Sequence, residues 1–204
     1  MELTPEIAYL AGFIGGDGNL SERRISLIDK NLEFHETALR NKFKKSFGIV
    51  PIISPMKTIK GATTYRSRVN SKEIYAFFSE KLRIPIKNKT FEMQTPREIM
   101  DSDKEIFSEY IKGWIDAEGW VTTKQTIRKS KTYVYPKVAF NVANRCIRDE
   151  LVEMLRKIGI EPSVWKSGNM FGFQIIGFEK VSRYKELVGF EHPDKIRKLN
   201  ILLA

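Results

Sequence analysis

Cysteine and histidine are scarce in this sequence, and long apolar runs are missing from it. One cysteine, Cys146, and two histidines among 204 residues exclude an intrachain disulfide and disfavour a zinc site built from these side chains. The apolar stretches stay well below the roughly 18 residues that a membrane span needs, and Met1 is not followed by a basic segment. We therefore expect an intracellular protein that is neither secreted nor inserted into a membrane.

Acidic residues are also outnumbered. The 25 Asp and Glu residues stand against 35 Lys and Arg residues, which gives a net charge of +10 and an isoelectric point near 9.6. Such a basic balance is typical of proteins that bind polyanions. Hydrophobic residues make up 42% of the chain, so one large domain or two small ones can bury a core.

The chain contains an internal repeat. The segment Leu10–Gly18 reads LAGFIGGDG, and Ile111–Gly119 reads IKGWIDAEG. A strand-like stretch ending in Asn31 or Asn144 follows each copy. A helical pattern with a Gly-x-x-Pro stop, further strand-like sequence and another helix come next in both. The repeat therefore predicts two similar halves.

Each half is predicted to run helix, two strands, helix, two strands, helix. We place the halves at residues 1–95 and 96–204, with a polar linker over residues 88–101 that has no clear period. The helices that contain the repeated segments are called the motif helices below.

Both motif helices have well-formed starts. Thr4-Pro5-Glu6 places a capping side chain, a proline at the first helical position and an acid in the first turn. Ser102 and Glu105 have the spacing of a capping box. Both helices are predicted to end at their terminal glycines, Gly18 and Gly119.

Small residues recur four positions apart in both motif helices, at Gly12 and Gly16 and at Gly113 and Ala117. A glycine inside a helix costs about 1 kcal/mol relative to alanine, so repeated glycines indicate a packing requirement that overrides propensity. A stripe of small residues lets two helix backbones approach closely. We therefore predict that the two motif helices pair with each other.

Asp17 and Glu118 occupy equivalent positions at the carboxyl ends of these helices, where the potential is already negative. If the helices pair about a pseudo-twofold axis, the carboxylates become neighbours whose repulsion Mg²⁺ would relieve. Such ions also bind phosphate oxygens and an attacking hydroxide. One acid alone would more often be a solvated turn residue, but the recurrence favours a phosphodiester hydrolysis site. Asp116, which corresponds to Gly15, is interpreted as structural or solvated.

These motifs resemble the LAGLIDADG homing endonucleases, whose name is the sequence that both segments approximate. The resemblance covers nearly the whole chain and is to the monomeric type with two motifs, known from archaeal introns and from inteins. The departures, Gly15-Gly16 and Ile111-Lys112, leave the terminal acids intact. The resemblance implies an α+β fold with two pseudo-symmetric αββαββα halves, saddle-shaped antiparallel sheets and paired motif helices at the interface.

The resemblance also implies site-specific cleavage of double-stranded DNA by a monomer, with Mg²⁺ (or Mn²⁺) as cofactor, located with the genomic or organellar DNA. The residues that would hold the metal ions are Asp17, Glu118, Gly16 and Ala117. Lys30 matches a family lysine that orients water or offsets charge on the phosphate. Ala143-Asn144 holds no lysine at the equivalent position, so the two cleavage sites are expected to be unequal.

The family's sheets lie over the DNA major groove, along a target of about 20 base pairs that need not be palindromic. Polar and apolar residues alternate in Tyr65–Asn70 and Lys137–Val142, which gives each strand one polar face. Side chains that could read bases from such faces are Arg24, Arg66, Arg68, Asn70, Lys137, Asn141 and Gln174. Cations in or near predicted hairpin turns would hold phosphates, namely Lys57, Lys60, Lys124, Arg128, Lys129, Lys131 and Lys166.

Two other functions stay open on the same fold. An intron-encoded RNA maturase and a non-catalytic DNA-binding regulator would both be basic, but such proteins usually lose a terminal acid, and this chain keeps both. Pro193-Asp194 lacks the following Glu-x-Lys of another nuclease class. His35 and His192 lack the spacing or partners of a histidine metal site and are predicted to be structural or solvated.

Overall fold

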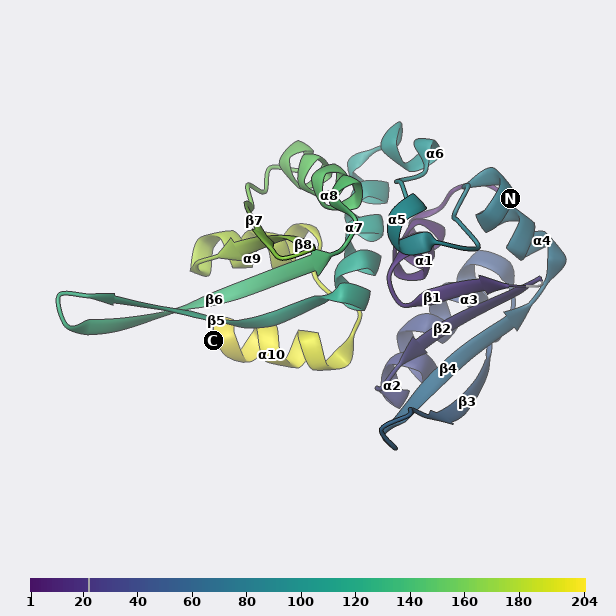
Figure 1. Cartoon of the computed structure of the whole chain (residues 1–204), viewed down its shortest axis with the longest axis horizontal. Coiled ribbons are helices and arrows are strands. Elements are labelled where there is room, and N and C mark those ends of the chain that lie inside the picture. Colours follow the sequence, from purple (N-terminus) through teal and green to yellow (C-terminus); the bar gives the residue numbers. More distant parts are fainter. Residues whose placement is uncertain (22) are drawn as a thin grey trace.

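The computed structural model describes residues 1–21 and 23–204. Two halves of the same plan face each other across a central pair of helices, α1 (Pro5–Gly15) and α7 (Lys104–Glu118) (Figure 1). This arrangement confirms the predicted fold class, including the paired motif helices.

The remaining elements follow the predicted order in both halves, except for one additional helix at the end of the second half that the sequence pattern did not predict. The first half contains β1 (Gly18–Ser21), β2 (Arg24–Asp29), a continuous helical segment made of α2 (Leu32–Phe34), η1 (His35–Leu39) and α3 (Arg40–Phe47), then β3 (Ile52–Lys57), β4 (Thr63–Asn70), α4 (Lys72–Ala76) and η2 (Phe77–Lys81). The linker contains α5 (Lys89–Glu92) and α6 (Arg97–Met100). The second half continues with β5 (Gly119–Arg128), β6 (Lys131–Val142), α8 (Arg145–Lys157), β7 (Ser163–Ser167), β8 (Met170–Ile176), α9 (Phe178–Leu187) and α10 (Pro193–Leu203).

Each half contains one four-stranded antiparallel sheet with the same strand order. The orders are β1-β2-β4-β3 and β5-β6-β8-β7. Because β1 starts at Gly18 and β5 at Gly119, each sheet begins where its motif helix ends. The residues that join helix to strand therefore lie at the junction of the two halves.

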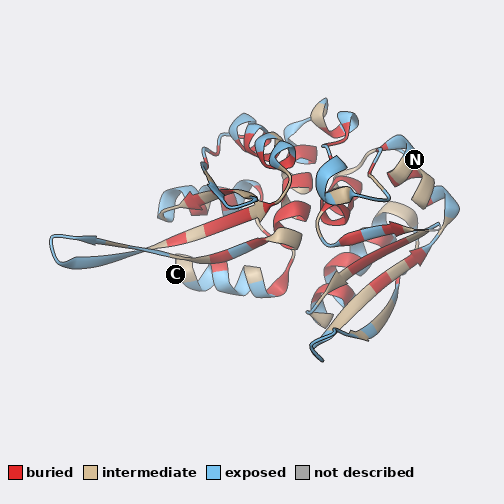
Figure 2. Cartoon of the chain, viewed as in Figure 1, coloured by how far each residue is buried: buried red, intermediate tan, exposed pale blue. Residues whose placement is uncertain are grey.

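In each sheet one face packs against helices, and the other face is polar. Ser67 and Val69 of β4 are buried, whereas Arg66 and Arg68 point to the opposite side. Buried residues fill the motif helices and the helix-covered sides of the sheets (Figure 2). Ala139 departs from the predicted alternation because its small side chain is buried on the polar face, between its strand neighbours Trp120 and Gln174.

α1 begins as predicted but ends early. Thr4 caps its start, and a proline occupies the first turn. The helix ends at Gly15 rather than at Gly18, because consecutive glycines at positions 15 and 16 weaken helical structure. Asp17 therefore lies in the turn between α1 and β1 rather than inside the helix.

α7 ends as predicted, at Gly119, but the predicted capping box is wrong. Asp103 caps the helix, and its carboxylate accepts hydrogen bonds from the N–H groups of Glu105 and Ile106, both at 3.0 Å. Ser102 lies one residue too early and donates its hydroxyl to a preceding carbonyl. An aspartate is as good an N-cap as a serine, so position decides between them.

The linker is hydrogen-bonded to the second half. It is also partly helical, which the sequence pattern did not predict. The Thr95 N–H donates to the Glu150 carboxylate (2.8 Å), and Asn144 Nδ2 donates to the Met93 carbonyl (2.7 Å). At the other end of the chain, α10 lies beside β5, the edge strand of the second sheet (Figure 1). Among the described residues, every helix is too short or too polar to cross a membrane.

Candidate active site

The two motif helices meet backbone to backbone. A Cβ atom placed on Gly12 would lie 2.2 Å from the Tyr110 carbonyl oxygen, and one placed on Gly113 would lie 2.1 Å from the Tyr9 carbonyl oxygen. Cβ atoms do not approach other atoms this closely, so only glycine fits at either position. The contact is reciprocal, as a pseudo-twofold axis between the helices requires.

The same contact brings the two acids to one place. A Cβ atom placed on Gly16 would lie 2.5 Å from the Ala117 Cβ and 3.0 Å from the Glu118 Cγ. Asp17 follows Gly16 directly along the chain. Both carboxylates therefore lie where the two helices end side by side.

The acids are difficult to ionise together. Asp17 is exposed and Glu118 is half-buried. Partial desolvation and the negative charge of Glu118 raise the pKa of Asp17 to about 6, and burial also raises the pKa of Glu118. Among the described residues, no group of three or more histidine, cysteine, aspartate or glutamate side chains could hold a metal ion. A cation between these two acids would therefore need further ligands from the backbone, from water or from phosphate.

Two lysines outside the predicted set supply positive charge here. Lys89 Nζ donates to three carbonyls at the end of α1, those of Ile14, Gly16 and Gly18 (2.9, 2.6 and 2.5 Å). Lys195 Nζ donates to two carbonyls at the end of α7, those of Ile115 and Asp116 (2.8 and 2.5 Å). Each lysine thus satisfies unpaired carbonyls where the helix dipole favours a cation. Burial lowers the pKa of both lysines, and their charges act against the raised pKa of the acids.

Two small pockets flank the acids, and each is built from both halves. The Lys195 pocket, of about 290 Å³, is lined by the end of α7, by Lys195 and Lys198 of α10, and by Asp29 and Lys30 where β2 of the first half ends. Lys30, the lysine predicted to serve catalysis, is exposed at this pocket. Several ammonium groups therefore gather on one side of the acid pair.

The Lys89 pocket, of about 230 Å³, is the counterpart on the other side. It is lined by the ends of both motif helices, including Glu118, by Lys89, and by Ala143 and Asn144 where β6 of the second half ends. No lysine replaces Lys30 at this corner. The two pockets therefore share a plan and differ in positive charge.

The polar face of the first sheet carries several candidate base readers. Arg24 of β2 lies opposite Asn70 of β4 in register, and its Nε donates to Asn70 Oδ1 (3.3 Å). Arg66 and Arg68 follow on the same face, and their buried Nε atoms lack a hydrogen-bond partner among the described residues. These guanidinium groups have donors left for a ligand that covers the face.

The first hairpin of the second sheet extends far beyond the sheet. β5 and β6 pair along their whole length, whereas β8 joins β6 only over Lys137–Val142. Residues 122–136 therefore form a protruding two-stranded ribbon (Figure 1). Lys124 lies within its strand rather than near the turn, and the cations close to the tip are Arg128, Lys129 and Lys131, all exposed. The sequence contains no acidic residue from Gly119 until Asp149.

The other candidate contacts are divided between surfaces. Lys137, Asn141 and Gln174 share the polar face of the second sheet. Lys166 lies on the opposite face, with its ammonium 5.3 Å from the centroid of the Phe171 ring. In the first half, Lys60 is exposed in the β3–β4 turn, and the exposed Lys57 beside that turn donates to a neighbouring hydroxyl.

Asp116 is buried and is used inside the protein. Its carboxylate accepts hydrogen bonds from the Tyr9 hydroxyl (2.8 Å) and from the N–H groups of Glu191 (2.8 Å) and His192 (3.3 Å). Burial raises the pKa of Asp116 to about 6. Of the two readings offered by the sequence, the structural one holds, because this acid joins both motif helices to the start of α10.

Both histidines are buried and hydrogen-bonded. His35 Nδ1 lies 2.7 Å from Ser67 Oγ, and His192 Nε2 lies 3.2 Å from Asp29 Oδ1. Burial lowers the pKa of His35. The two residues are structural rather than solvated.

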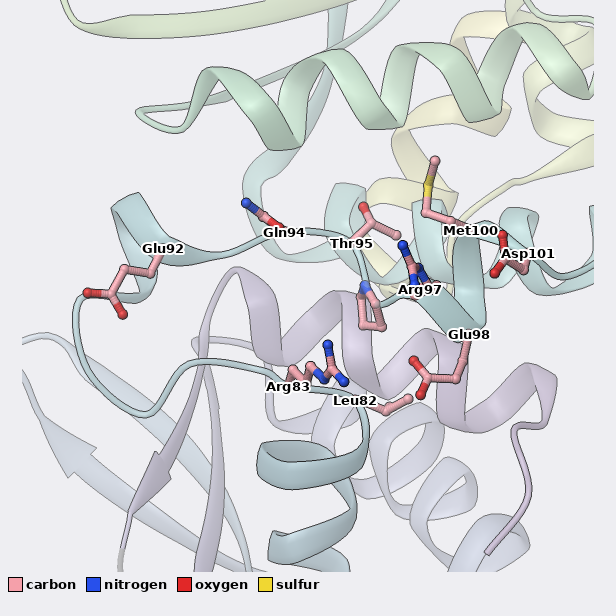
Figure 3. Close-up of a pocket in the computed structure, with 10 residues that line it drawn as sticks. Leu82, Arg83, Glu92, Gln94, Thr95, Arg97, Glu98, Met100 and Asp101 are labelled. Carbon is pink, nitrogen blue, oxygen red and sulfur yellow. The ribbon is translucent and has the colours of Figure 1, made fainter.

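A larger pocket than the Lys89 pocket or the Lys195 pocket lies away from the acids. It has a volume of about 610 Å³ and is bounded by the linker and the end of the first half. Its charged lining residues are Arg83, Arg97, Glu92, Glu98 and Asp101, and Glu92 lies apart from the two arginines (Figure 3). Its charged side chains have both signs, and neither acid of the helix junction lines it. We therefore place the candidate active site at the helix junction.

The two half-buried lysines occupy equivalent positions in the two halves, which becomes visible only once the helices are placed. Each follows the last sheet-covering helix of its half at a similar distance along the chain, since η2 ends at Lys81 and α9 at Leu187. The residues around Lys89 and Lys195 share no local motif. Only their place in the repeat relates them.

Known proteins resemble this chain over both halves. The homing endonuclease I-ApeI of Aeropyrum pernix is 28% identical over 146 residues, which cover 69% of this chain and 61% of that protein. A glutamine–fructose-6-phosphate aminotransferase of Methanocaldococcus jannaschii is 26% identical over 209 residues, which cover 98% of this chain but 18% of that protein. The chain thus spans less than two thirds of the length of these curated relatives.

The fold and the family agree with these similarities. The structure of I-DmoI in complex with DNA and Mn has a TM-score of 0.61 and 16% identity, over 91% of this chain and 96% of that one. The homing endonuclease I-WcaI bound to its DNA recognition sequence has a TM-score of 0.67 and 15% identity, over 98% of this chain and 88% of that one. A family model described as LAGLIDADG-like domain matches residues 4–83 and 105–189. The predicted resemblance is confirmed, and the chain belongs to the family of LAGLIDADG-like domains.

Proposed function

We propose that the chain is a site-specific, metal-dependent endonuclease of double-stranded DNA. The observation that carries the proposal is the placement of Asp17 and Glu118, one from each half, at a junction with a half-buried lysine on either side. An enzyme that cuts two strands must reach two phosphates, and the junction has one pocket on each side. Similarity to I-ApeI, and to I-DmoI with DNA and Mn, supports this assignment.

The residues at the junction fit a divalent cation. Asp17 and Glu118 offer carboxylate oxygens, which hard cations prefer. The pKa values of both acids are raised, which shows that the positive charge around them does not fully stabilise their ionised forms. The carbonyls of Gly16 and Ala117 adjoin them, and the Gly16 carbonyl keeps a lone pair beside its bond from Lys89. We infer Mg²⁺ or Mn²⁺ as the ion. When bound, it would lower the pKa of water and neutralise charge on the phosphate.

Lys89 and Lys195 supply fixed positive charge for the reaction. Main-chain carbonyls hold both ammonium groups, so their positions are set before DNA binds. Attack by water on phosphorus forms a P–O bond, and the water releases one proton to solvent. The bond to the 3′ oxygen breaks, and this oxygen leaves with the electron pair and takes up one proton from solvent. Negative charge grows on the phosphate during this step, and the ammonium groups offset it. Lys30 adds a further cation on the Lys195 side only.

The polar faces of the two sheets are the proposed DNA-binding surface. Arg24, Arg66 and Arg68 on the first sheet carry donors suited to purine edges in the major groove. The ribbon of the second sheet adds a row of cations without nearby acids, which suits phosphates. We expect a target of about 20 base pairs with two unlike half-sites, because the two surfaces differ. The division of the chain into residues 1–95 and 96–204 is part of this proposal.

A cleavage assay with isosteric variants tests the proposal. The substrate is a plasmid that carries the joined flanks of the genetic element encoding the chain. With Mg²⁺, the wild-type protein should make one double-strand cut with short 3′ overhangs. Asp17→Asn and Glu118→Gln should bind this DNA with unchanged affinity and cleave it at least about a hundredfold more slowly. Variants that cut at the wild-type rate would refute the role of the two acids.

The same assay separates the two alternative functions. An RNA maturase would bind its intron RNA more tightly than the plasmid site and leave the DNA uncut. A non-catalytic regulator would bind the DNA and leave it uncut with every divalent cation tested. The presence of both acids argues against either outcome.

A further inference from the structure

α10, the helix that carries Lys195, is held at its start by both halves of the protein. From its own half, the Asp116 carboxylate accepts the N–H groups of Glu191 and His192. From the other half, the Asp29 carboxylate lies 3.2 Å from His192 Nε2. His192 is therefore a direct link between the two halves at the entrance of α10.

The two ring nitrogens of His192 have separate tasks. Nδ1 accepts the Asp194 N–H (3.2 Å) and caps α10, so Nε2 carries the proton that is donated to Asp29. The side chains of His192 and Asp29 are only 4% and 13% exposed, which leaves little room for water to replace this bond. The Asn31 N–H also donates to Asp29 (2.6 Å), and the Phe34 ring packs against the imidazole.

We propose that the Asp29–His192 hydrogen bond is a positioning contact that sets Lys195 in its pocket, so that cleavage of one DNA strand depends on a contact between the halves. Lys195 lies in the first turn of α10, and any shift of the helix start moves its ammonium relative to Ile115 and Asp116. This inference rests on the proposed nuclease function. It adds that the two strand cleavages are controlled separately.

The Lys89 side lacks an equivalent side-chain link among the described residues. There, Asn144 of the second half donates to the carbonyl of Met93. This carbonyl lies after the end of α5, whereas His192 lies at the start of α10. A change at His192 should therefore reach the Lys195 pocket and leave the Lys89 pocket as it is. This difference makes the proposal testable strand by strand.

Two substitutions at one position separate the tasks of His192. In His192→Asn, the amide oxygen can replace Nδ1 as the helix cap but cannot reach Asp29. In His192→Gln, the amide nitrogen can replace Nε2 and reach Asp29, while the cap is lost. Arg197→Ala is the matched control, because it removes exposed ion pairs to Glu33 of the first half (3.1 Å) and to Asp194 in the same helix (2.6 Å), and exposed pairs contribute little.

The measurement is the pair of rate constants for the two strands, with protein in excess over the plasmid site and Mg²⁺ present. His192→Asn should slow one strand by about tenfold or more, as misplacement of a catalytic group does, with accumulation of nicked circles and the other strand unchanged. His192→Gln and Arg197→Ala should keep the wild-type ratio of the two rates. Thermal unfolding verifies that each variant is folded.

Two results would overturn the positioning role. One is equal slowing of both strands in His192→Asn, which would indicate a general structural defect. The other is a changed strand ratio in His192→Gln together with an unchanged ratio in His192→Asn, which would assign the effect to the cap rather than to Asp29. A wild-type protein that leaves the plasmid uncut would instead remove the proposed nuclease function itself.

Discussion

The two halves of the molecule have similar structures at the helix junction and different structures in their outer hairpins. At the junction, Gly12 and Gly113 make the same backbone contact, and one lysine caps each motif helix. Away from it, β1 and β2 have 4 and 6 residues, whereas β5 and β6 have 10 and 12. Mutual contact constrains the centre to be similar in both halves. The outer hairpins carry no such constraint, so each can follow a different stretch of DNA.

Removing the charge of either Lys89 or Lys195 would test whether the two lysines have equivalent roles at the junction. Lys89→Met and Lys195→Met keep the apolar stem and remove the ammonium. We expect each to slow cleavage of a different strand by about a hundredfold, because each lysine lines a different pocket. Strand-resolved single-turnover rates measure this, with the exposed Lys72→Met as control. Slowing of the same strand by both variants would contradict the assignment of one pocket to each strand.

Adding a methyl group at the helix contact would test whether the two glycines contribute equally to the free energy of unfolding. Gly12→Ala and Gly113→Ala each drive a Cβ into a facing carbonyl, and we expect each to lower the free energy of unfolding by about 3 kcal/mol. Gly61→Ala meets open space at a φ of +80° and should cost only about 1 kcal/mol. Denaturant titration gives all three values. A tolerated substitution at only one of the two helix positions would show that the contact is not reciprocal.

The cations of the β5–β6 ribbon test whether the outer hairpin of the second half contacts DNA. Replacing Arg128 and Lys131 by glutamine should weaken DNA binding and reduce the slope of log affinity against log salt by about 2, if each side chain contacts one phosphate. The rate of cleavage at saturating protein should not change. Lys180→Gln with Lys185→Gln, exposed on α9, is the matched control and should leave the slope unaltered. An unchanged slope in the ribbon variant would place the ribbon off the DNA.

The smallest expected effect concerns the acids without metal. The pKa of Asp17 is raised from 3.8 to about 6, so its protonated form favours the fold below pH 3.8, and this contribution is lost as the pH rises through about 6. Metal-free wild-type protein should therefore lose melting temperature relative to Asp17→Asn between about pH 4 and pH 7, and Mg²⁺ should reverse the loss. Calorimetry across this range measures it. A difference that does not vary with pH would contradict the crowding of the two carboxylates.

The fold could be predicted largely from the repeat, because glycine stripes, terminal caps and strand alternation are local patterns. The two half-buried lysines could not be predicted in this way. Lys89 and Lys195 bind main-chain carbonyls, which have no signature in the sequence, and those carbonyls lie far away along the chain. The Asp29–His192 bond joins opposite ends of the chain for the same reason. The catalytic role of Lys30 stays a prediction.

The segment that joins the halves also contributes a residue to the candidate active site, because α5 brings Lys89 to the end of α1. Anyone who divides this chain into two polypeptides must therefore choose the break with care. A break after Met93 would leave the lysine covalently attached to the half whose helix it caps. A break before Asn88 would transfer it to the other fragment, and the first half would then depend on its partner for its own cation.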